Sequence, residues 1–366
     1  MASRNTAHVD PLSLVFTPIP PSTSSRAVVK LTLLNCGELI SSRVMFRQRQ
    51  TMAEMAEQET AVVFSWVVEK EIAGEVKRYL WDLGVVSSLD KVPKQIADAV
   101  RPRFALNVPA AAQPPFILSH LSPSPAPVET LTGLFLSHAH FDHYGCMTDF
   151  PSRLPLYVGP GTKTWVKGGD EAPGGLKGFP SAFWRHPVFV GEIGEEGAKG
   201  KGKEWTSVGT YEKAWDWFGD GSFTLLQAPG HCPGHMCALA RVSTSPDTYV
   251  LLAADTCHSR YIYTPFPHPS HRHAIAHFAP VSEGPAETTP GSATMHGDVA
   301  EAYRSIARLT RMEMEENVMC VLAHETEVAQ ELRVGVGEMK QGWERWKENG
   351  WKIEKERGVH PQPKMV

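Results

Sequence analysis

The residues most suited to chemistry form one short run, His138-Ala-His140-Phe-Asp142-His143. His138 and His140 are two positions apart, so on an extended segment their imidazoles project to the same side. Asp142 and His143 can turn back toward the same point if a helix begins there. Imidazole and carboxylate ligands without a thiolate suit zinc, and iron or manganese would accept the same set. The run therefore predicts a metal site and leaves the identity of the metal open.

Three more candidate ligands, His231, Asp255 and His324, each follow a β-rich apolar segment further along the chain. Active sites are usually assembled from loops at strand ends. A set of histidine and aspartate residues at several strand ends has few structural uses apart from metal binding. We therefore expect these three side chains to converge on the first run.

The order of these residues resembles the metallo-β-lactamase superfamily. The resemblance rests on HxHxDH at a strand end, the later Gly230-His231, a strand ending in Asp255 and a late strand ending in His324, and it covers residues 28–330. Trp81-Asp82-Leu-Gly84 also resembles the short Asp-x-Gly turn that the family carries before its metal motif. The resemblance implies an α/β fold, specifically a four-layer αββα sandwich.

The resemblance also implies a centre of two divalent metal ions, with Zn2+ expected and iron or manganese as alternatives. In such a centre His138, His140 and His231 hold one metal, Asp142, His143 and His324 hold the other, and Asp255 bridges them. A water molecule shared by two metals loses its proton near neutral pH, and the resulting hydroxide attacks a carbonyl carbon polarised by a metal. In the family, the residue at the Asp142 position orients that hydroxide or passes a proton to the leaving atom. The implied enzyme is a zinc-dependent hydrolase.

Residues just after Asp255 are close enough in sequence to reach a substrate oxygen. In lactone-cleaving members of the family, a tyrosine shortly after the bridging aspartate has that kind of role. Here the third residue after Asp255 is His258, and Tyr261 follows it. We predict His258 and Tyr261 as catalytic residues beside Asp142, with the oxyanion donor left open.

Aromatic residues near the metal loops are candidates for an apolar substrate pocket, although most aromatic side chains in a folded protein belong to its core. Phe141 and Tyr144 flank ligands, and Phe266 follows the Asp255 segment. The histidine-only first site resembles lactonase-like and glyoxalase-II-like branches. Together these features favour the opening of a cyclic ester or amide, a lactone or lactam, of a small hydrophobic or aromatic molecule. The Pro-rich start and the run 230–241 resemble fungal members from detoxification or secondary metabolism.

Three other functions remain to be weighed, because a fold alone does not choose the substrate. A thioesterase acting on an acyl-carrier or glutathione thioester would need basic residues along the thiol arm, and the basic cluster at 199–203 lies in a low-complexity stretch. A metal-free binding protein of the same fold would be expected to lose ligands, and here every ligand position is filled. A flavodiiron-type oxidoreductase would need a flavin domain, for which the chain leaves no room.

Composition narrows the partners to a small-molecule substrate. The 366 residues are 42% hydrophobic and carry a formal charge of −4, which disfavours nucleic acid as a partner. No run approaches the roughly 18 apolar residues of a membrane span, so we expect no membrane insertion. The six cysteines are scattered, and no leader precedes them, which favours reduced thiols and a cytoplasmic protein. The sequence leaves the oligomeric state open.

The expected domain organisation is one large domain with peripheral segments. We expect a flexible N-terminal arm over 1–27, a single catalytic domain over 28–350 and a C-terminal tail over 351–366. A Gly-rich surface insertion is expected around 168–203. Alternating and apolar runs predict strands over 28–34, 61–68, 78–85, 131–136, 154–158, 222–226, 249–254 and 318–323, with helices over 90–100 and 303–310.

Overall fold

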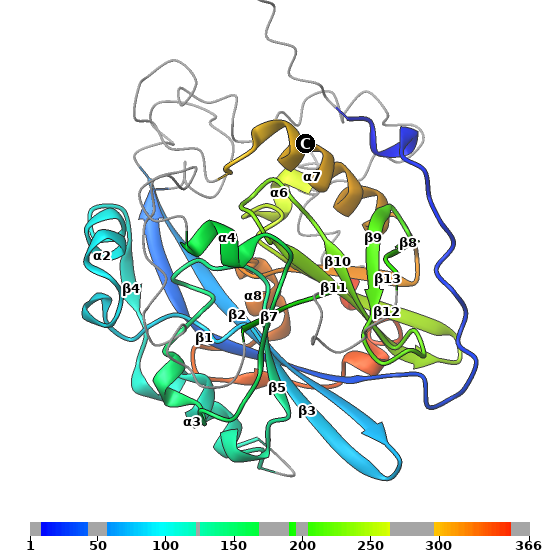
Figure 1. Cartoon of the computed structure of the whole chain (residues 1–366), viewed down its shortest axis with the longest axis horizontal. Coiled ribbons are helices and arrows are strands. Elements are labelled where there is room, and N and C mark those ends of the chain that lie inside the picture. The colour runs from blue at the N-terminus through cyan, green and yellow to red at the C-terminus, as the bar shows by residue number, and fades with distance from the viewer. Residues whose placement is uncertain are drawn as a thin grey trace, which may run out of the picture.

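The computed structural model describes residues 9–42, 57–121, 125–167, 190–194, 204–263 and 296–352. In this part of the chain the strands form two sheets (Figure 1). The first sheet contains β1 (Lys30–Ser42), β2 (Gln58–Ile72), β3 (Glu75–Trp81), β4 (Ala105–Asn107), β5 (Gly133–Leu136), β6 (Leu156–Val158), β7 (Val190–Glu192) and β14 (Met339–Lys340). The second contains β8 (Thr206–Val208), β9 (Tyr211–Asp216), β10 (Phe223–Gln227), β11 (Met236–Thr244), β12 (Asp247–Ala254) and β13 (Val318–Leu322).

Both sheets mix parallel and antiparallel pairs. The first runs in the order β14-β1-β2-β3-β5-β6-β7, with β4 on β1, and the second in the order β13-β12-β11-β10-β9-β8. Strands β3, β5, β6 and β7 pair in parallel, as do β12 and β13. The described helices are α2 (Lys94–Val100), α3 (Pro114–Ser119), α4 (Thr162–Lys167), α6 (Arg260–Tyr263), α7 (Val299–Glu313) and α8 (Thr326–Leu332). Parallel neighbours end at the same sheet edge, which is where the metal-motif loops begin.

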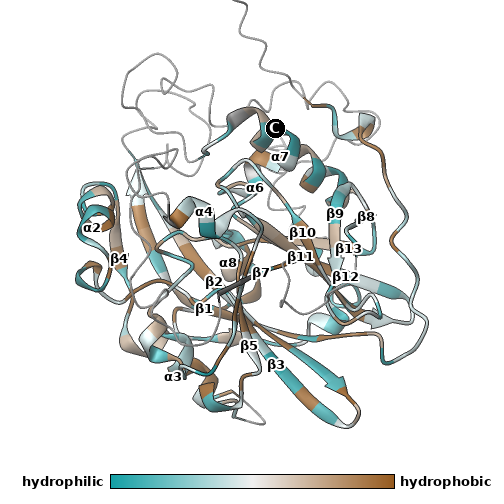
Figure 2. Cartoon of the chain, in the orientation of Figure 1, coloured by the Kyte–Doolittle hydropathy of each residue, from teal (hydrophilic) through white to brown (hydrophobic). Residues whose placement is uncertain are grey.

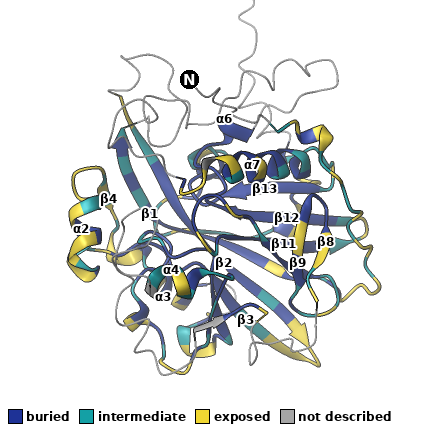
Figure 3. Ribbon diagram, turned by 45° about the horizontal axis from the view of Figure 1, so that its top comes forward, coloured by how far each residue is buried: buried dark blue, intermediate teal, exposed yellow. Residues whose placement is uncertain are grey.

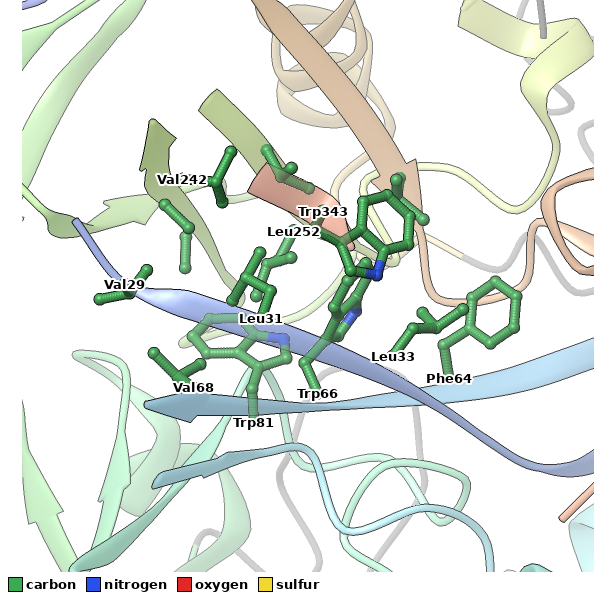
Figure 4. Packing of buried hydrophobic residues seen from close by; sticks show 14 of the residues in the cluster. Val29, Leu31, Leu33, Phe64, Trp66, Val68, Trp81, Val242, Leu252 and Trp343 are labelled. Carbon is green, nitrogen blue, oxygen red and sulfur yellow. The ribbon is translucent and has the colours of Figure 1, made fainter. Parts of the chain in front are cut away.

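The two sheets face one another across a hydrophobic core. Alternation along β2 sends Phe64 and Trp66 into this core, while Val63 and Val67 point to the opposite face of the sheet. Figure 4 shows Leu31, Trp66 and Trp81 of the first sheet packed toward Val242 and Leu252 of the second, with Trp343 beside them. This arrangement forms the two middle layers of a sandwich.

Helices cover the outer face of each sheet. Residues of α2 and α3, including Ile96 and Ile117, share a core cluster with the outer face of the first sheet. Residues of α6 and α7, including Leu309 and Met312, share another cluster with the second sheet. Figure 2 shows that α7 carries both hydrophilic and hydrophobic residues, as a helix covering a sheet should, and Figure 3 shows that its exposed residues alternate with buried ones. The four layers confirm the predicted αββα sandwich.

The N-terminal segment that we expected to be an arm lies, over its described residues 9–27, against the second sheet. The buried Arg241 guanidinium donates hydrogen bonds to the carbonyl oxygens of Pro20 and Ala27, at 2.6 and 3.2 Å. Thr17 forms an isolated bridge with Gly209. The segment has little regular structure, but buried and bridging contacts hold its described part on the domain.

Most predicted elements occupy their expected places, with shifted ends. The helix expected over 90–100 begins at Lys94, because Pro93 precedes it and a short 3-10 turn occupies 89–91. The range 168–203 lies mostly outside the described residues, yet β7 within it pairs with β6 in the first sheet. Several described strands were not predicted, namely β4, β7, β8, β9, β11 and β14. No described helix has the length and hydropathy needed to span a bilayer.

Candidate metal centre

Three imidazoles converge at one end of the sandwich. His138 and His140 lie in the loop after β5, and His231 lies in the loop between β10 and β11. The Nδ1 atom of His140 is 3.0 Å from His138 Nε2 and 2.9 Å from His231 Nε2. With a carboxylate oxygen of Asp255, these atoms form a group whose members all lie within 4.8 Å of one another. The predicted first ligand set therefore comes together.

A second group lies on the other side of Asp255. His324 Nε2, from the loop after β13, is 3.4 Å from Asp142 Oδ2 and 3.3 Å from Asp255 Oδ1. His143 Nε2 lies 3.2 Å from the same Asp255 oxygen. Asp142 and His143 reach this point through a tight turn, in which His143 N–H donates to the His140 carbonyl at 3.1 Å. The turn replaces the helix start that the sequence suggested, and it brings the second predicted ligand set together.

Asp255 lies between the two groups, with one carboxylate oxygen toward each. Its Oδ2 is 3.7 Å from His138 Nε2 and 3.5 Å from His231 Nε2, whereas Oδ1 faces the second group. The residue follows β12, and its neighbour Ala254 has a left-handed backbone (φ 45°) that ends the strand. This is the arrangement expected of a carboxylate that bridges two cations.

Partners at the far side of each ring decide which nitrogen faces the centre. Asp82 Oδ2 lies 2.9 Å from His143 Nδ1, and it also accepts a hydrogen bond from the Ser137 hydroxyl at 2.8 Å. The Ser137 oxygen is 3.0 Å from His138 Nδ1. Since the serine proton is given to Asp82, His138 Nδ1–H must donate to the serine oxygen. Both rings therefore direct Nε2 toward the centre, the nitrogen that each would offer to a metal once it is unprotonated.

His324 is oriented by a different element. Its Nδ1 donates to the carbonyl oxygen of Val62 in β2 at 2.7 Å, so its Nε2 is also left to face the second group. The contact joins the loop after β13 in the second sheet to a strand of the first. The packing of the two sheets thus fixes the orientation of the His324 ring.

His235 has both a structural role and a supporting role at the centre. Its Nδ1 lies 2.7 Å from the Ala228 carbonyl, and its Nε2 accepts a hydrogen bond from the Asp255 backbone N–H at 3.1 Å. A carbonyl only accepts and an N–H only donates, so the ring is neutral with its proton on Nδ1. Burial lowers the pKa of His235 to about 4, which agrees with a neutral ring. His235 closes the turn after His231 and holds the backbone of the bridging residue.

The two groups differ in protonation when no cation is present. Burial and the neighbouring His143 hold the pKa of His138 well below its usual value, and burial lowers the pKa of His140 to about 4. In the second group burial acts the same way, but the carboxylates of Asp255 and Asp142 outweigh it and raise the pKa of His324 to about 10. Asp255 and Asp82 likewise raise the pKa of His143. The second group therefore holds its protons against a metal more strongly than the first.

The residues present fit two divalent cations. His143 Nε2 and Asp255 Oδ1 are buried and form no hydrogen bond among the described residues, although they are 3.2 Å apart. Three imidazole nitrogens that meet at 2.9–3.0 Å would bring lone pairs together unless a cation or proton lay between them. Nitrogen and oxygen donors without a thiolate suit zinc, iron or manganese.

The remaining predicted site residues lie at different depths. His258 is buried, with Nε2 3.2 Å from Asp255 Oδ2, so it belongs to the centre. Phe141 is half-buried and packs against Phe104, whereas Tyr144 is buried in the core cluster beneath α2 and α3. The backbone of Tyr261 is in α6, but the position of its side chain is not described. Phe266 lies outside the described residues.

Two more aromatic rings lie beside the centre; Trp165 was one of the aromatic residues considered for an apolar pocket, and His296 was missed in the sequence. Trp165 of α4 meets the His140 ring edge-on, with centroids 5.6 Å apart. His296, just before α7, is buried with its ring 5.3 Å from His231. Nothing local marks His296, because it reaches the centre through the docking of α7 on the loop that carries His231. The only feature of the sequence that could have suggested a place near the metals was the residue type.

The turn that carries His231 is wedged between two helices. Gly234 has φ +81°, and a Cβ there would come within 1.8 Å of Thr162 Oγ1 at the start of α4. Gly230 has φ +122°, and a Cβ there would meet the backbone of Ala302 in α7 at 2.3 Å. Glycine is required at both positions by the backbone conformation and by the close approach.

Comparison with known proteins agrees with this architecture. The chain is 29% identical over 313 residues to cytochrome P450 monooxygenase mpaDE of Penicillium roqueforti, which covers 84% of the chain and 34% of that protein. It is 32% identical over 195 residues to gamma-lactamase FDB1 of Fusarium pseudograminearum, which covers 52% of the chain and 43% of that protein. The chain therefore spans about a third to a half of the length of these curated relatives.

Solved structures show the same fold. An N-acyl homoserine lactone hydrolase with its product at the metal centre superimposes with a TM-score of 0.56 and 18% identity, over 84% of this chain and 97% of that one. The family model described as the metallo-beta-lactamase superfamily matches residues 108–308, which hold six of the seven ligands described above. With both ligand groups assembled at the edge of an αββα sandwich, the chain belongs to the metallo-beta-lactamase superfamily.

Proposed function

We propose that this chain is a metal-dependent hydrolase that opens the ring of a small, hydrophobic or aromatic lactone or lactam. The observation that carries the proposal is the position of Asp255, whose two oxygens face two separate groups of histidine ligands. Two zinc ions held there would act as Lewis acids and lower the pKa of a water molecule between them. The relatives named as lactamases and lactonases support this class of reaction.

Asp142 is suited to move a proton within this reaction. Burial favours its neutral form, but the imidazoles of His143 and His324 outweigh burial and hold its pKa below the usual value. Its Oδ2 lies 3.4 Å from His324 Nε2 at the edge of the second group. As a carboxylate it can accept a proton from the attacking water. Water adds to the carbonyl carbon, the ring bond to oxygen or nitrogen breaks, and that atom takes the proton from Asp142.

The apolar part of the substrate is proposed to lie beside His140. Six of the seven ligand side chains are buried, whereas His140 is half-buried, as are its neighbours Phe141 and Trp165. Phe141 packs against the half-buried Phe104, and Trp165 meets the His140 ring. Aromatic side chains around the more accessible ligand favour an aromatic substrate over a charged thiol arm. This favours the lactone or lactam over the glutathione thioester.

The test uses three bicyclic substrates that differ in one ring atom. Dihydrocoumarin, 3,4-dihydroquinolin-2-one and thiochroman-2-one present an ester, an amide and a thioester in nearly the same shape. An S-acylglutathione serves as the acyclic thioester. Turnover of the ester or amide by the zinc-loaded chain, lost with a chelator and restored by zinc, is the expected result. Rapid cleavage of only the two thioesters would replace the proposal with a thioesterase.

Substitution of Asp142 and of Asp255 tests whether turnover depends on the two-metal mechanism. Asp142→Ala and Asp255→Ala should each lose nearly all turnover, because one removes the proton carrier and the other removes the bridge. Asp90→Ala is the matched control, since its side chain is 85% exposed. Metal analysis should show two ions per chain in the native protein and fewer in Asp255→Ala. Full turnover in either active-site variant would contradict the two-metal mechanism.

A further inference from the structure

We propose that His258 and His296 form a pair of hydrogen-bond donors that binds the substrate oxygen on which negative charge develops during ring opening. The inference rests on the hydrolytic function proposed above and adds a residue, His296, that neither the motifs nor the ligand groups include. It also identifies the atom that the pair would bind. This atom is the carbonyl oxygen of a lactone or lactam, which becomes a carboxylate oxygen in the product.

His258 lies over the junction of the two ligand groups. Its ring is 5.0 Å from that of His231 in the first group, and it stacks on His324 of the second group with centroids 6.0 Å apart and planes 16° apart. Its Nε2 is 3.2 Å from Asp255 Oδ2. That nitrogen is buried and forms no hydrogen bond among the described residues. A polar atom in this position, facing the bridging carboxylate, is available to a ligand bound between the groups.

His296 completes a triangle of rings with His231 and His258. Its ring centroid is 5.3 Å from that of His231 and 5.5 Å from that of His258. The residue is only 4% exposed. His296 is absent from both ligand groups, so its ring nitrogens are not placed to share either metal. His296 therefore places a buried imidazole beside His231 of the first group and beside His258.

The position of His296 is fixed by the docking of α7 on the ligand loop. Gly297 N–H donates to the His231 carbonyl at 2.8 Å, and Asp298 N–H donates to the Gly230 carbonyl at 2.9 Å. Further along α7, the Ser305 hydroxyl donates to the Pro229 carbonyl at 2.6 Å. Three hydrogen bonds, two from the residues just before α7 and one from α7 itself, hold the His296 backbone in place beside the His231 loop. A preorganised donor of this kind stabilises developing charge without reorganising.

Two imidazoles suit an oxygen that passes from carbonyl to oxyanion. An imidazole carries at least one N–H, so the pair can offer two donors to one oxygen. A hydrogen bond to a charged oxygen is stronger than one to a neutral carbonyl, so the pair favours the transition state over the bound substrate. The same donors would hold a carboxylate oxygen of the ring-opened acid.

The first test compares side chains that differ by a single donor. His258→Phe should lower kcat about 100-fold or more, as removing one oxyanion donor does, while His258→Tyr restores a hydroxyl donor and recovers most of the loss. His296→Phe should lower kcat similarly, with partial recovery in His296→Gln. The double phenylalanine variant should lose less than the product of the single effects, because both rings bind one oxygen. His120→Phe, at an exposed position, is the control.

The second test does not depend on turnover. Calorimetry measures binding of 3-(2-hydroxyphenyl)propanoate, the acid formed when dihydrocoumarin opens, to the zinc-loaded protein. Each phenylalanine variant should weaken binding about tenfold or more, the cost of a hydrogen bond to a charged group. Zinc content and thermal unfolding should match the native protein. If the native chain binds the acid but hydrolyses no cyclic substrate, the proposed function fails while the donor pair stands.

Three results would overturn the donor pair. One is unchanged kcat and unchanged acid binding in His296→Phe with native zinc content. Another is loss of a zinc ion in either phenylalanine variant, because the rings would then serve the metals. The third is a kcat that falls as far in His258→Tyr as in His258→Phe, and as far in His296→Gln as in His296→Phe. A side chain able to donate a hydrogen bond would then restore nothing at either position.

Discussion

Asp82 Oδ2 lies 2.9 Å from Nδ1 of His143, and this contact links the end of β3 to the second ligand group. The same oxygen accepts the Ser137 hydroxyl, which in turn accepts a hydrogen bond from His138 of the first group. Asp82 is itself in the left-handed region, at φ 58°. One carboxylate outside both groups therefore orients a ligand in each.

We predict that Asp82→Asn weakens zinc binding about 10- to 100-fold, the usual effect of losing a carboxylate that orients metal-binding histidines. Asparagine tolerates the left-handed backbone, so the change removes charge without adding strain. Competition against a chromophoric chelator measures the affinity of both sites. Asp90→Asn, at an exposed carboxylate, should bind zinc as the native chain does. Equal affinities in the two variants would show that the Asp82 contact is dispensable.

Gly234→Ala should disturb the first ligand group, since the added Cβ would meet Thr162 Oγ1 at 1.8 Å. Gly74 offers a matched control, because its φ of +82° equals that of Gly234 within a degree, while a Cβ added there would meet nothing within 4 Å. Both substitutions carry the left-handed cost of about 1–2 kcal/mol. We expect Gly234→Ala to lose about 1–3 kcal/mol more, from overpacking, in urea unfolding. Zinc content should fall in Gly234→Ala alone; identical behaviour of the two variants would contradict this packing argument.

A buried ion network joins the loop after Asp255 to the loop after His324. The fully buried Arg260 donates to Glu325 Oε1 at 3.1 Å and to Glu331 Oε1 at 2.7 Å. Glu325 also accepts the Leu322 backbone N–H at 3.0 Å, so it shapes the turn that presents His324. Burial opposes the charge on Arg260, but these carboxylates raise its pKa above the usual value.

Arg260→Met should therefore destabilise the protein by about 3–5 kcal/mol, because Glu325 would be left buried without its cation. Arg101→Met, which breaks an exposed pair with Asp90, should cost no more than about 1 kcal/mol. Adding Glu325→Gln to Arg260→Met should recover part of the loss. Denaturant unfolding of the four proteins measures these differences. A loss as small as that of the exposed pair would mean that the network does not hold the two loops together.

The sequence was sufficient to predict the candidate ligands that converge into two groups and to predict most of the strands. Metal coordination restricts both residue type and spacing, so His138, His231 and Asp255 could be chosen without a structure. Alternation along β1 and β2 is equally visible, because each has one face toward the second sheet and one toward the helices.

What the sequence could not supply depends on packing between distant elements. His296 reaches the centre through α7, which docks on the His231 loop, and Arg260 meets Glu325 because β12 and β13 pair in parallel. Strand β11 begins with Met236-Cys-Ala-Leu-Ala, a short apolar run that suits a helix as well as a strand. Such features follow from long-range contacts that leave no local pattern.

The metal-free protein should be most stable near pH 6.5. Burial lowers the folded-state pKa of His140 and of His235 to about 4, so below the unfolded value of about 6.5 the unfolded chain binds more protons and acidification destabilises the fold. The folded-state pKa of His324 is raised to about 10, so its contribution is complete below about pH 6.5 and is lost as the pH rises toward 10.

Thermal unfolding of chelator-treated protein, measured from about pH 5 to about pH 9, should give a maximum in this window. His235→Gln should partly flatten the acid side, because it removes one of the buried histidines whose pKa is lowered. Zinc requires unprotonated imidazoles, so the zinc-loaded protein should not lose stability on the alkaline side as His324 titrates. A melting temperature of the metal-free protein that rises steadily to pH 9 would contradict the raised pKa of His324. One that stays level down to pH 5 would contradict the lowered pKa values of His140 and His235.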